Sequence, residues 1–102
     1  MALYKSYPKK GETCKVTFEL PPEATTNVKK VALVGDFNGW DTTTHPLTRN
    51  KEGAFSITVV LDQGKEYQFR YFMDDYRWEN DWAADRYAPS SFGNCDNSVV
   101  IV

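Results

Sequence analysis

The sequence is poor in residues that hold metal ions and in stretches that cross membranes. It has one histidine, His45, and two cysteines, Cys14 and Cys95, whose spacing matches no metal-ligand pattern. No apolar run approaches the length of about 20 residues that spans a bilayer. The N-terminal residues also lack the apolar core of a secretory signal. We therefore expect a cytoplasmic protein with no metal site, no cofactor and no membrane segment.

Charge of one sign and helical periodicity are missing as well. The chain has 12 basic and 14 acidic side chains and a net charge of −2, so no surface for nucleic acid is indicated. No segment repeats apolar residues at a helical period, and Trp82–Ala84 would form one helical turn at most. The two cysteines fit either two reduced thiols or a bridge between the first and last strands. The missing secretory signal favours the reduced thiols.

The chain does show the alternation of apolar and polar residues that is typical of β-strands. Within Cys14–Leu20, the apolar side chains of every second residue share one face of a half-buried strand. The apolar run from Lys30 to Gly35 is typical of a central strand buried on both faces. Further strands are expected at Ala54–Leu61, at Glu66–Asp74, around Trp78 and at Ser98–Val102. About six to eight short strands in a chain of this length predict an all-β fold, a two-sheet antiparallel β-sandwich.

The remaining segments are expected to be irregular. Met1–Thr13 contains proline and glycine without periodicity, and we interpret it as an N-terminal arm. The rest, residues 14–102, is interpreted as a single domain. Asp41–Gly53 is expected to be a loop that inserts Leu47 into the core, and Ala83–Asn97 is expected to be irregular.

Aromatic residues make up 15% of the chain, and many of them fall between Tyr67 and Tyr87. Two more, Phe37 and Trp40, lie in the turn after the central strand, where we expect one to fold onto the core and the other to stay exposed. The polar Asp36 and Asn38 of this turn are expected to hydrogen-bond within it. In the strand that begins at Glu66, alternation places Tyr67, Phe69, Tyr71 and Met73 inward and Gln68, Arg70 and Phe72 outward.

Several of these segments together resemble a known family. The chain carries, in order, Gly35–Asp41 (GDFNGWD), Pro46–Arg49 (PLTR), Tyr67–Asp74 (YQFRYFMD), Trp78 and Asp96–Val100 (DNSVV). They resemble carbohydrate-binding module family 48, the isoamylase N-terminal early-set domain, and are similar to the glycogen-binding domain of the AMP-activated protein kinase beta subunit. The resemblance covers nearly the whole chain. It implies an immunoglobulin-like (early-set) antiparallel β-sandwich that binds α-1,4-linked glucans.

The resemblance also implies which residues hold the sugar. Two tryptophans that grip the sugar in the kinase domain fall on Trp40 and Trp78, and a basic residue falls on Arg70. Indole rings suit the C–H face of glucose, while its hydroxyl rim needs hydrogen-bond donors and acceptors. With Arg70 and Phe72 pointing outward between them, the two indoles are expected to converge on one patch.

The last loop and the last strand are expected to complete this patch. A hydrophobic residue of the family corresponds to Phe92. An asparagine of the family falls on Asp96, which accepts hydrogen bonds from hydroxyls but has no amide group to donate. Asn97 would add a further hydrogen bond.

We expect a non-catalytic module that binds glycogen, starch or maltooligosaccharides as a monomer. An alternative is an interaction domain that has lost its sugar site and acts in trans on a glucan-metabolising enzyme or kinase. This alternative is suggested by the substitution at Asp96 and by the absence of a fused catalytic domain.

A glycoside hydrolase would need two carboxyl groups on either side of the scissile bond. The carboxylates that invite this comparison are Asp74, Asp75, Glu79, Asp81 and Asp85. None has a visibly apolar sequence context that would raise its pKa, and so small a sandwich has little room for an enclosed cleft. Asp74, Asp81 or Asp85 also fits a surface ion pair with Arg70. We therefore expect no catalysis.

Overall fold

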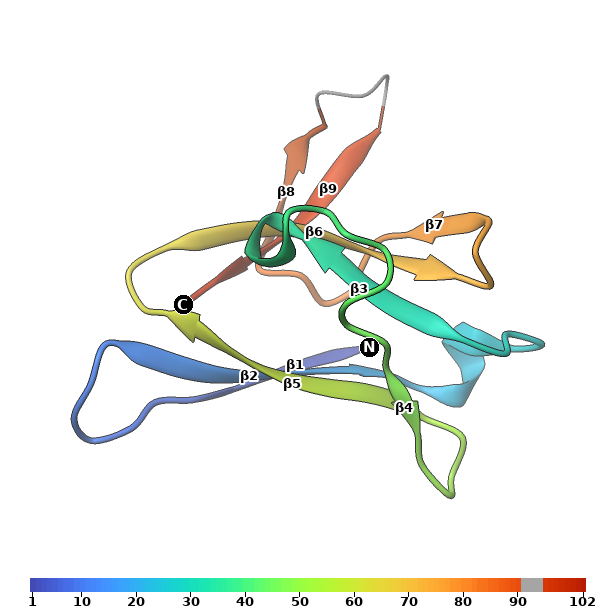
Figure 1. Ribbon diagram of the computed structural model, residues 1–102, viewed down its shortest axis with the longest axis horizontal. Coiled ribbons are helices and arrows are strands. Elements are labelled where there is room, and N and C mark those ends of the chain that lie inside the picture. The colour runs from blue at the N-terminus through green and yellow to red at the C-terminus, as the bar shows by residue number, and fades with distance from the viewer. Residues whose placement is uncertain (91–94) are drawn as a thin grey trace.

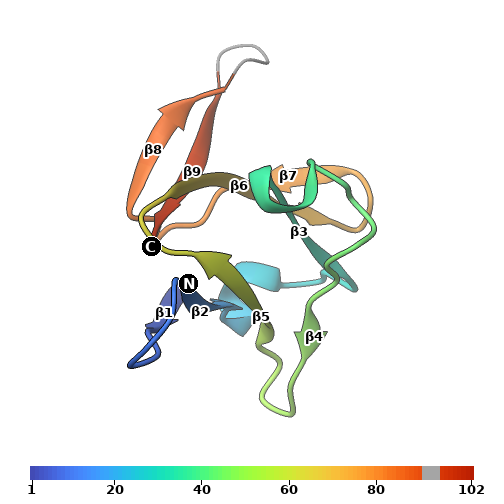
Figure 2. The same cartoon turned by 60° about the vertical axis from the view of Figure 1, so that its left-hand side comes forward.

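The computed structural model describes residues 1–90 and 95–102, and within these ranges nine strands form two antiparallel sheets that lie as two layers (Figure 1, Figure 2). The first sheet has the order β1-β2-β5-β4, with β1 at Ala2–Ser6, β2 at Thr13–Leu20, β5 at Phe55–Asp62 and β4 at Thr48–Arg49. The second has the order β3-β6-β9-β8, with β3 at Val31–Gly35, β6 at Glu66–Met73, β9 at Asp96–Ile101 and β8 at Arg86–Pro89. β7, at Arg77–Glu79, pairs with β6. Two short 3₁₀ helices are η1 at Pro22–Thr25 and η2 at Asp36–Asn38. The predicted all-β, immunoglobulin-like sandwich is confirmed.

The core lies between the inward faces of the two sheets. Phe18 of β2 and Phe69 of β6 meet edge to face across the layers, with ring centroids 5.1 Å apart. The other fully buried or nearly buried side chains of these two strands are Cys14, Val16, Leu20, Tyr71 and Met73. The predicted phase of β6 is therefore confirmed, and its outward side chains are left to line the opposite face of the second sheet.

The N-terminal segment contains regular structure that the sequence pattern did not predict. Residues 2–6 form β1, which pairs with β2 along its whole length. The alternation is obscured because Lys5 lies on the same face as Leu3, opposite the inward Val16. Lys5 Nζ is satisfied there by an ion pair of 2.7 Å with Asp85. The arm predicted for residues 1–13 is thus in part an edge strand.

Two segments predicted to be irregular also contain strands. Arg86–Pro89 forms β8, which pairs with β9, and β9 begins at Asp96 instead of Ser98. β8 escaped prediction because three of its four side chains are exposed and only Ala88 is buried. Its proline lies at the end of an edge strand, where a missing N–H donor is tolerated. In the loop of residues 41–53, the short strand β4 is an addition.

Other expectations about the loops are met. Leu47 is buried in the core, and Phe37 packs against Phe18 with ring centroids 6.1 Å apart, while Trp40 stays exposed.

No disulfide joins the buried Cys14 to the exposed Cys95. Across residues 1–90 and 95–102, no helix is long and apolar enough to cross a membrane.

Candidate functional site

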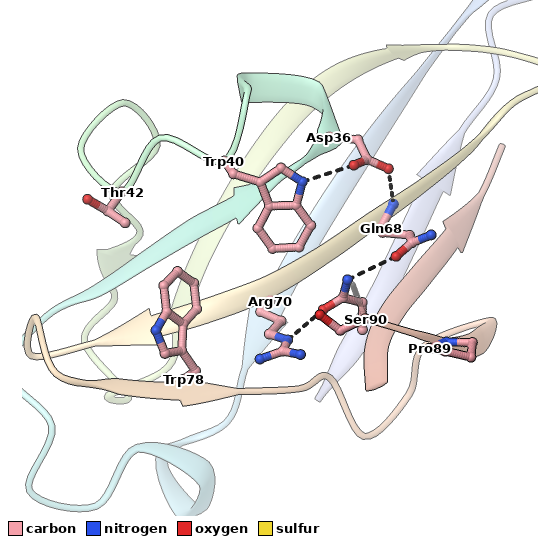
Figure 3. Close-up of a pocket in the computed structure, with 9 residues that line it drawn as sticks. Asp36, Trp40, Thr42, Gln68, Arg70, Trp78, Pro89 and Ser90 are labelled. Carbon is pink, nitrogen blue, oxygen red and sulfur yellow. Dashed lines mark hydrogen bonds between the residues drawn. The ribbon is translucent and has the colours of Figure 1, made fainter. Parts of the chain in front are cut away.

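A pocket of about 750 Å³ lies on the face of the second sheet that points away from the core (Figure 3). Alternation along β6 explains its floor, because Gln68 and Arg70 point outward between the buried Phe69 and Tyr71. Its walls come from the loop after β3, from β7 and from the ends of β8 and β9. The lining residues are Asp36, Trp40, Thr42, Gln68, Arg70, Trp78, Pro89, Ser90 and Asn97.

Trp40 is presented by a tightly closed turn. Gly35 ends β3 so close to β6 that an added Cβ would lie 2.5 Å from the main-chain oxygen of Gln68. The Asn38 side chain accepts a hydrogen bond from the Gly35 N–H and donates one to the Leu33 carbonyl, each at 3.0 Å. The chain then turns back through Gly39 (φ 65°) and Trp40 (φ 59°) in the left-handed region. This conformation directs the indole, which is 36% exposed, toward the pocket.

Trp78 lines the same pocket from β7 (Figure 3). It lies in β7 directly opposite Phe72 of β6. The two rings stack with centroids 4.4 Å apart and planes tilted by 33°. One face of the Trp78 indole is therefore covered by Phe72, and the side chain remains 42% exposed.

A chain of hydrogen bonds connects the polar residues of the pocket. Arg70 Nε donates to Asn97 Oδ1 at 2.6 Å, and Arg70 Nη2 donates to the Cys95 sulfur at 3.0 Å. Asn97 Nδ2 donates to Gln68 Oε1 at 2.9 Å. Arg70 therefore bonds to Asn97 and Cys95 and not to the carboxylates with which a surface ion pair had been considered. These two bonds fix the guanidinium in the pocket that both indoles line.

Comparison with protein-family models matches residues 23–88 to Carbohydrate-binding module 48 (Isoamylase N-terminal domain). This match covers more than half of the chain and contains Arg70 and the two pocket tryptophans, Trp40 and Trp78. The chain belongs to the carbohydrate-binding module 48 family. The predicted family is thereby confirmed.

Curated relatives are 1,4-alpha-glucan-branching enzymes. The module is 39% identical over 64 residues to the enzyme of Emericella nidulans, a match that covers 59% of this chain and 9% of the enzyme. It is 44% identical over 59 residues to that of Saccharomyces cerevisiae, which covers 55% of this chain and 8% of the enzyme. For Paramagnetospirillum magneticum the values are 40% over 53 residues, 50% of this chain and 7% of the enzyme. The chain thus spans less than a tenth of the length of these relatives.

Four of the six predicted sugar-contacting residues, Trp40, Arg70, Trp78 and Asn97, line this module's pocket. Phe92 lies outside the described residues. Asp96 is exposed and does not appear among the pocket's lining residues. Since neighbouring residues of a strand point to opposite faces, Asp96 faces away from Asn97. Its main-chain oxygen accepts a hydrogen bond from Asn80.

The sequence did not predict every residue that lines the pocket. Gln68 was correctly placed on the outward face of β6, next to Arg70, and its position alone could have marked it as a pocket residue. Asp36 was expected to bond within its own turn. It does accept a hydrogen bond from the Trp40 indole, but it also accepts one from the Gln68 main chain on β6. The other missed lining residues are Thr42, Pro89 and Ser90.

Exposure alone does not make an aromatic residue part of this site. Trp82 is 63% exposed, more than either pocket tryptophan, yet it does not line the pocket. Tyr76 and Tyr87 are also exposed and also lie outside the pocket lining. These three residues are surface residues of the module.

Two carboxylates of residues 74–85, those of Asp74 and Asp85, link distant parts of the chain. Asp74 accepts main-chain hydrogen bonds from Lys30 and Lys29, each at 2.9 Å, and these bonds lower the pKa of its carboxyl group. Asp85 accepts hydrogen bonds from Lys5 and from the Ile101 main chain. Within the described ranges, no cluster of three His, Cys, Asp or Glu side chains is arranged to hold a metal ion.

Asp81 is fully buried, which its sequence context did not indicate. Its carboxylate accepts hydrogen bonds from the Tyr71 hydroxyl at 2.6 Å and from the Ala83 N–H at 2.7 Å. Its own N–H donates to Ser98 Oγ on β9. Burial, with the Asp81 charge, raises the pKa of Tyr71 well above its ordinary value, so the hydroxyl keeps its proton and remains a donor.

Proposed function

We propose that this module binds α-1,4-linked glucans without catalysing their breakdown, and that Trp40 and Trp78 stack on the sugar. The observation that carries the proposal is one pocket that is lined by two exposed indoles and a guanidinium (Figure 3). Ring faces suit the C–H faces of glucose, and the polar floor suits its hydroxyl rim. Membership of a carbohydrate-binding family supports the same function.

The polar floor offers hydrogen-bond donors to the hydroxyl groups of a sugar. Gln68 uses its side-chain oxygen for Asn97, and in the described part of the chain its Nε2 donates to no protein acceptor, so this NH₂ group can donate to a sugar. The guanidinium of Arg70 likewise has more N–H groups than the two that are bonded. The Asn97 side chain accepts from Arg70 and donates to Gln68, so it holds both of these side chains in the pocket floor.

The expected affinity for a short oligosaccharide is modest. Each stacked ring contributes about 1–2 kcal/mol after desolvation, and each hydrogen bond about 1 kcal/mol net. The cost of ordering the sugar removes much of this sum, which leaves a Kd on the order of 10 μM to 1 mM. Repeated chains on a polymer would raise the apparent affinity through avidity.

A non-catalytic role agrees with the charges in the pocket. Among the described lining residues, Asp36 is the one carboxylate, and both of its oxygens already accept hydrogen bonds. Glycoside hydrolysis in most families requires an acid and a second carboxylate on opposite sides of the scissile bond. The described side chains of this pocket supply no such pair.

The test is a chemical-shift titration of the labelled protein with maltoheptaose, alongside the β-linked cellohexaose. We expect maltoheptaose to move the indole N–H resonances of Trp40 and Trp78 with saturation in the submillimolar to millimolar range, and cellohexaose to leave them in place. Unchanged spectra at millimolar maltoheptaose would overturn the proposal. If the protein does not bind maltoheptaose but recovers a glucan-metabolising enzyme in a pull-down, the result would favour the adaptor function.

A further inference from the structure

Asp36, the first residue of η2, connects the loop that carries Trp40 to the central strand of the pocket floor. Its Oδ1 accepts the indole N–H of Trp40 at 3.0 Å, and its Oδ2 accepts the main-chain N–H of Gln68 at 2.8 Å (Figure 3). One carboxylate thus bridges an exposed side chain and a strand that is paired on both sides. Hydrogen bonds to an ionised acceptor are among the stronger ones in proteins.

The Trp40 indole has little else to fix its orientation. The main chain of Trp40 is held by a hydrogen bond of 2.9 Å to the Gly35 carbonyl, which sets where the side chain begins but not how the ring is turned. Among the described residues, no aromatic ring stacks on Trp40, whereas Phe72 covers one face of Trp78. The two indoles are therefore held by different means: Trp78 by ring stacking and Trp40 by a carboxylate.

We propose that Asp36 is a positioning residue, which orients the Trp40 indole for the glucan without touching it. This inference rests on the proposed function. Because the indole N–H is occupied by Asp36, Trp40 offers the sugar its ring face and no hydrogen-bond donor. Without the bridge, glucan binding would have to order a large side chain, a cost that corresponds to about a three- to tenfold increase in Kd.

The test compares Asp36→Ala and Asp36→Asn with the control Asp41→Asn. Asp41 is an exposed aspartate on the same loop, and its carboxylate accepts hydrogen bonds from Thr43, so the control makes the same charge change away from the indole. We expect the Kd for maltoheptaose to rise about three- to tenfold in Asp36→Ala. The rise should be smaller in Asp36→Asn, which retains one acceptor oxygen, and Asp41→Asn should match the wild type.

Two further measurements separate positioning from a general loss of structure. In the ligand-free protein, Asp36→Ala should shift the indole N–H resonance of Trp40 and speed its exchange with solvent, while that of Trp78 stays in place. In a mutant cycle, Asp36→Ala should add no further loss of affinity to Trp40→Ala, because Asp36 acts through that ring.

Each outcome decides the inference. Equal maltoheptaose affinity of Asp36→Ala and the wild type overturns this inference alone, and so does an unmoved Trp40 resonance. Fully additive losses in the cycle would mean that Asp36 acts on the sugar or the fold directly, which also overturns it. A wild type that binds no maltoheptaose overturns the proposed function, and this inference falls with it.

Discussion

Removing Trp78 tests the proposed site most directly, since its indole borders the pocket while contributing little to the core. Its side chain is 42% exposed, and its main packing partner is Phe72, with ring centroids 4.4 Å apart. Trp78→Ala leaves the pairing of β7 with β6 intact, because that pairing is made by main-chain atoms. The substitution therefore removes a sugar platform without opening a cavity in the sandwich.

The expected loss follows from the ring's two contacts. The stack on a glucose ring is worth about 1–2 kcal/mol, so the Kd for maltoheptaose should rise about 5- to 30-fold. The stack on Phe72 is worth about 0.5–1.5 kcal/mol, which sets the expected decrease in the free energy of unfolding. The protein should remain folded, because a domain of this size is stable by roughly 5–15 kcal/mol.

Isothermal titration calorimetry with maltoheptaose, paired with urea denaturation, measures both quantities. Trp82→Ala is the matched control, since it deletes the same side chain at a more exposed position outside the pocket lining. It should leave the affinity unchanged. If Trp78→Ala binds as well as the wild type, or if Trp82→Ala loses as much affinity, the reasoning from the pocket geometry is wrong.

Three further predictions concern the fold and its pH dependence. Gly35→Ala should destabilise the protein by about 3 kcal/mol in urea denaturation, because the new Cβ would meet a main-chain oxygen of β6 at 2.5 Å, and a loss near zero would contradict this. Tyr71→Phe should cost about 1–3 kcal/mol in the same assay, since it leaves the buried Asp81 carboxylate without its hydroxyl donor; wild-type stability would refute the role of this pair. The pKa of Asp74 is lowered below 3.8 by main-chain hydrogen bonds, so its stabilising effect is present above that pH and lost as the pH falls through the lowered pKa. Thermal melts across acid pH should therefore decline less steeply for Asp74→Asn than for the wild type, and parallel curves would exclude this contribution.

The sequence predicted those strands whose two faces differ clearly in polarity. β6 is the best case, because its inward residues are aromatic or apolar and its outward residues include Gln68 and Arg70. β1 and β8 were missed for the opposite reason. The inward position of Lys5 in β1 is neutralised by Asp85, which is 80 residues away in the chain, and no local pattern reports such a partner. In β8, only Ala88 is buried.

The site was predictable where it depends on motif residues and on strand phase. Trp40, Arg70 and Trp78 were placed in one patch, and the pocket contains all three. Hydrogen-bond partners were not predictable in the same way, because they join distant segments. Asp81 illustrates this: its carboxylate looks like one of several surface charges in the sequence, but Tyr71 and Ser98 from two different strands enclose it.

β6 connects the fold and the site, because its side chains alternate between the core on one face and the pocket on the other. Its outward residues at 68, 70 and 72 stand about 7 Å apart and each supports one part of the pocket. The main-chain N–H of Gln68 donates to Asp36, Arg70 lies between positions 68 and 72 in the pocket floor, and Phe72 stacks on Trp78. A shift of one residue in the register of β6 would turn all three into the core and expose Phe69 and Tyr71. The inward residues therefore enforce the register that the proposed sugar site needs, and we expect substitutions at the three outward positions to change binding while the sandwich stays folded.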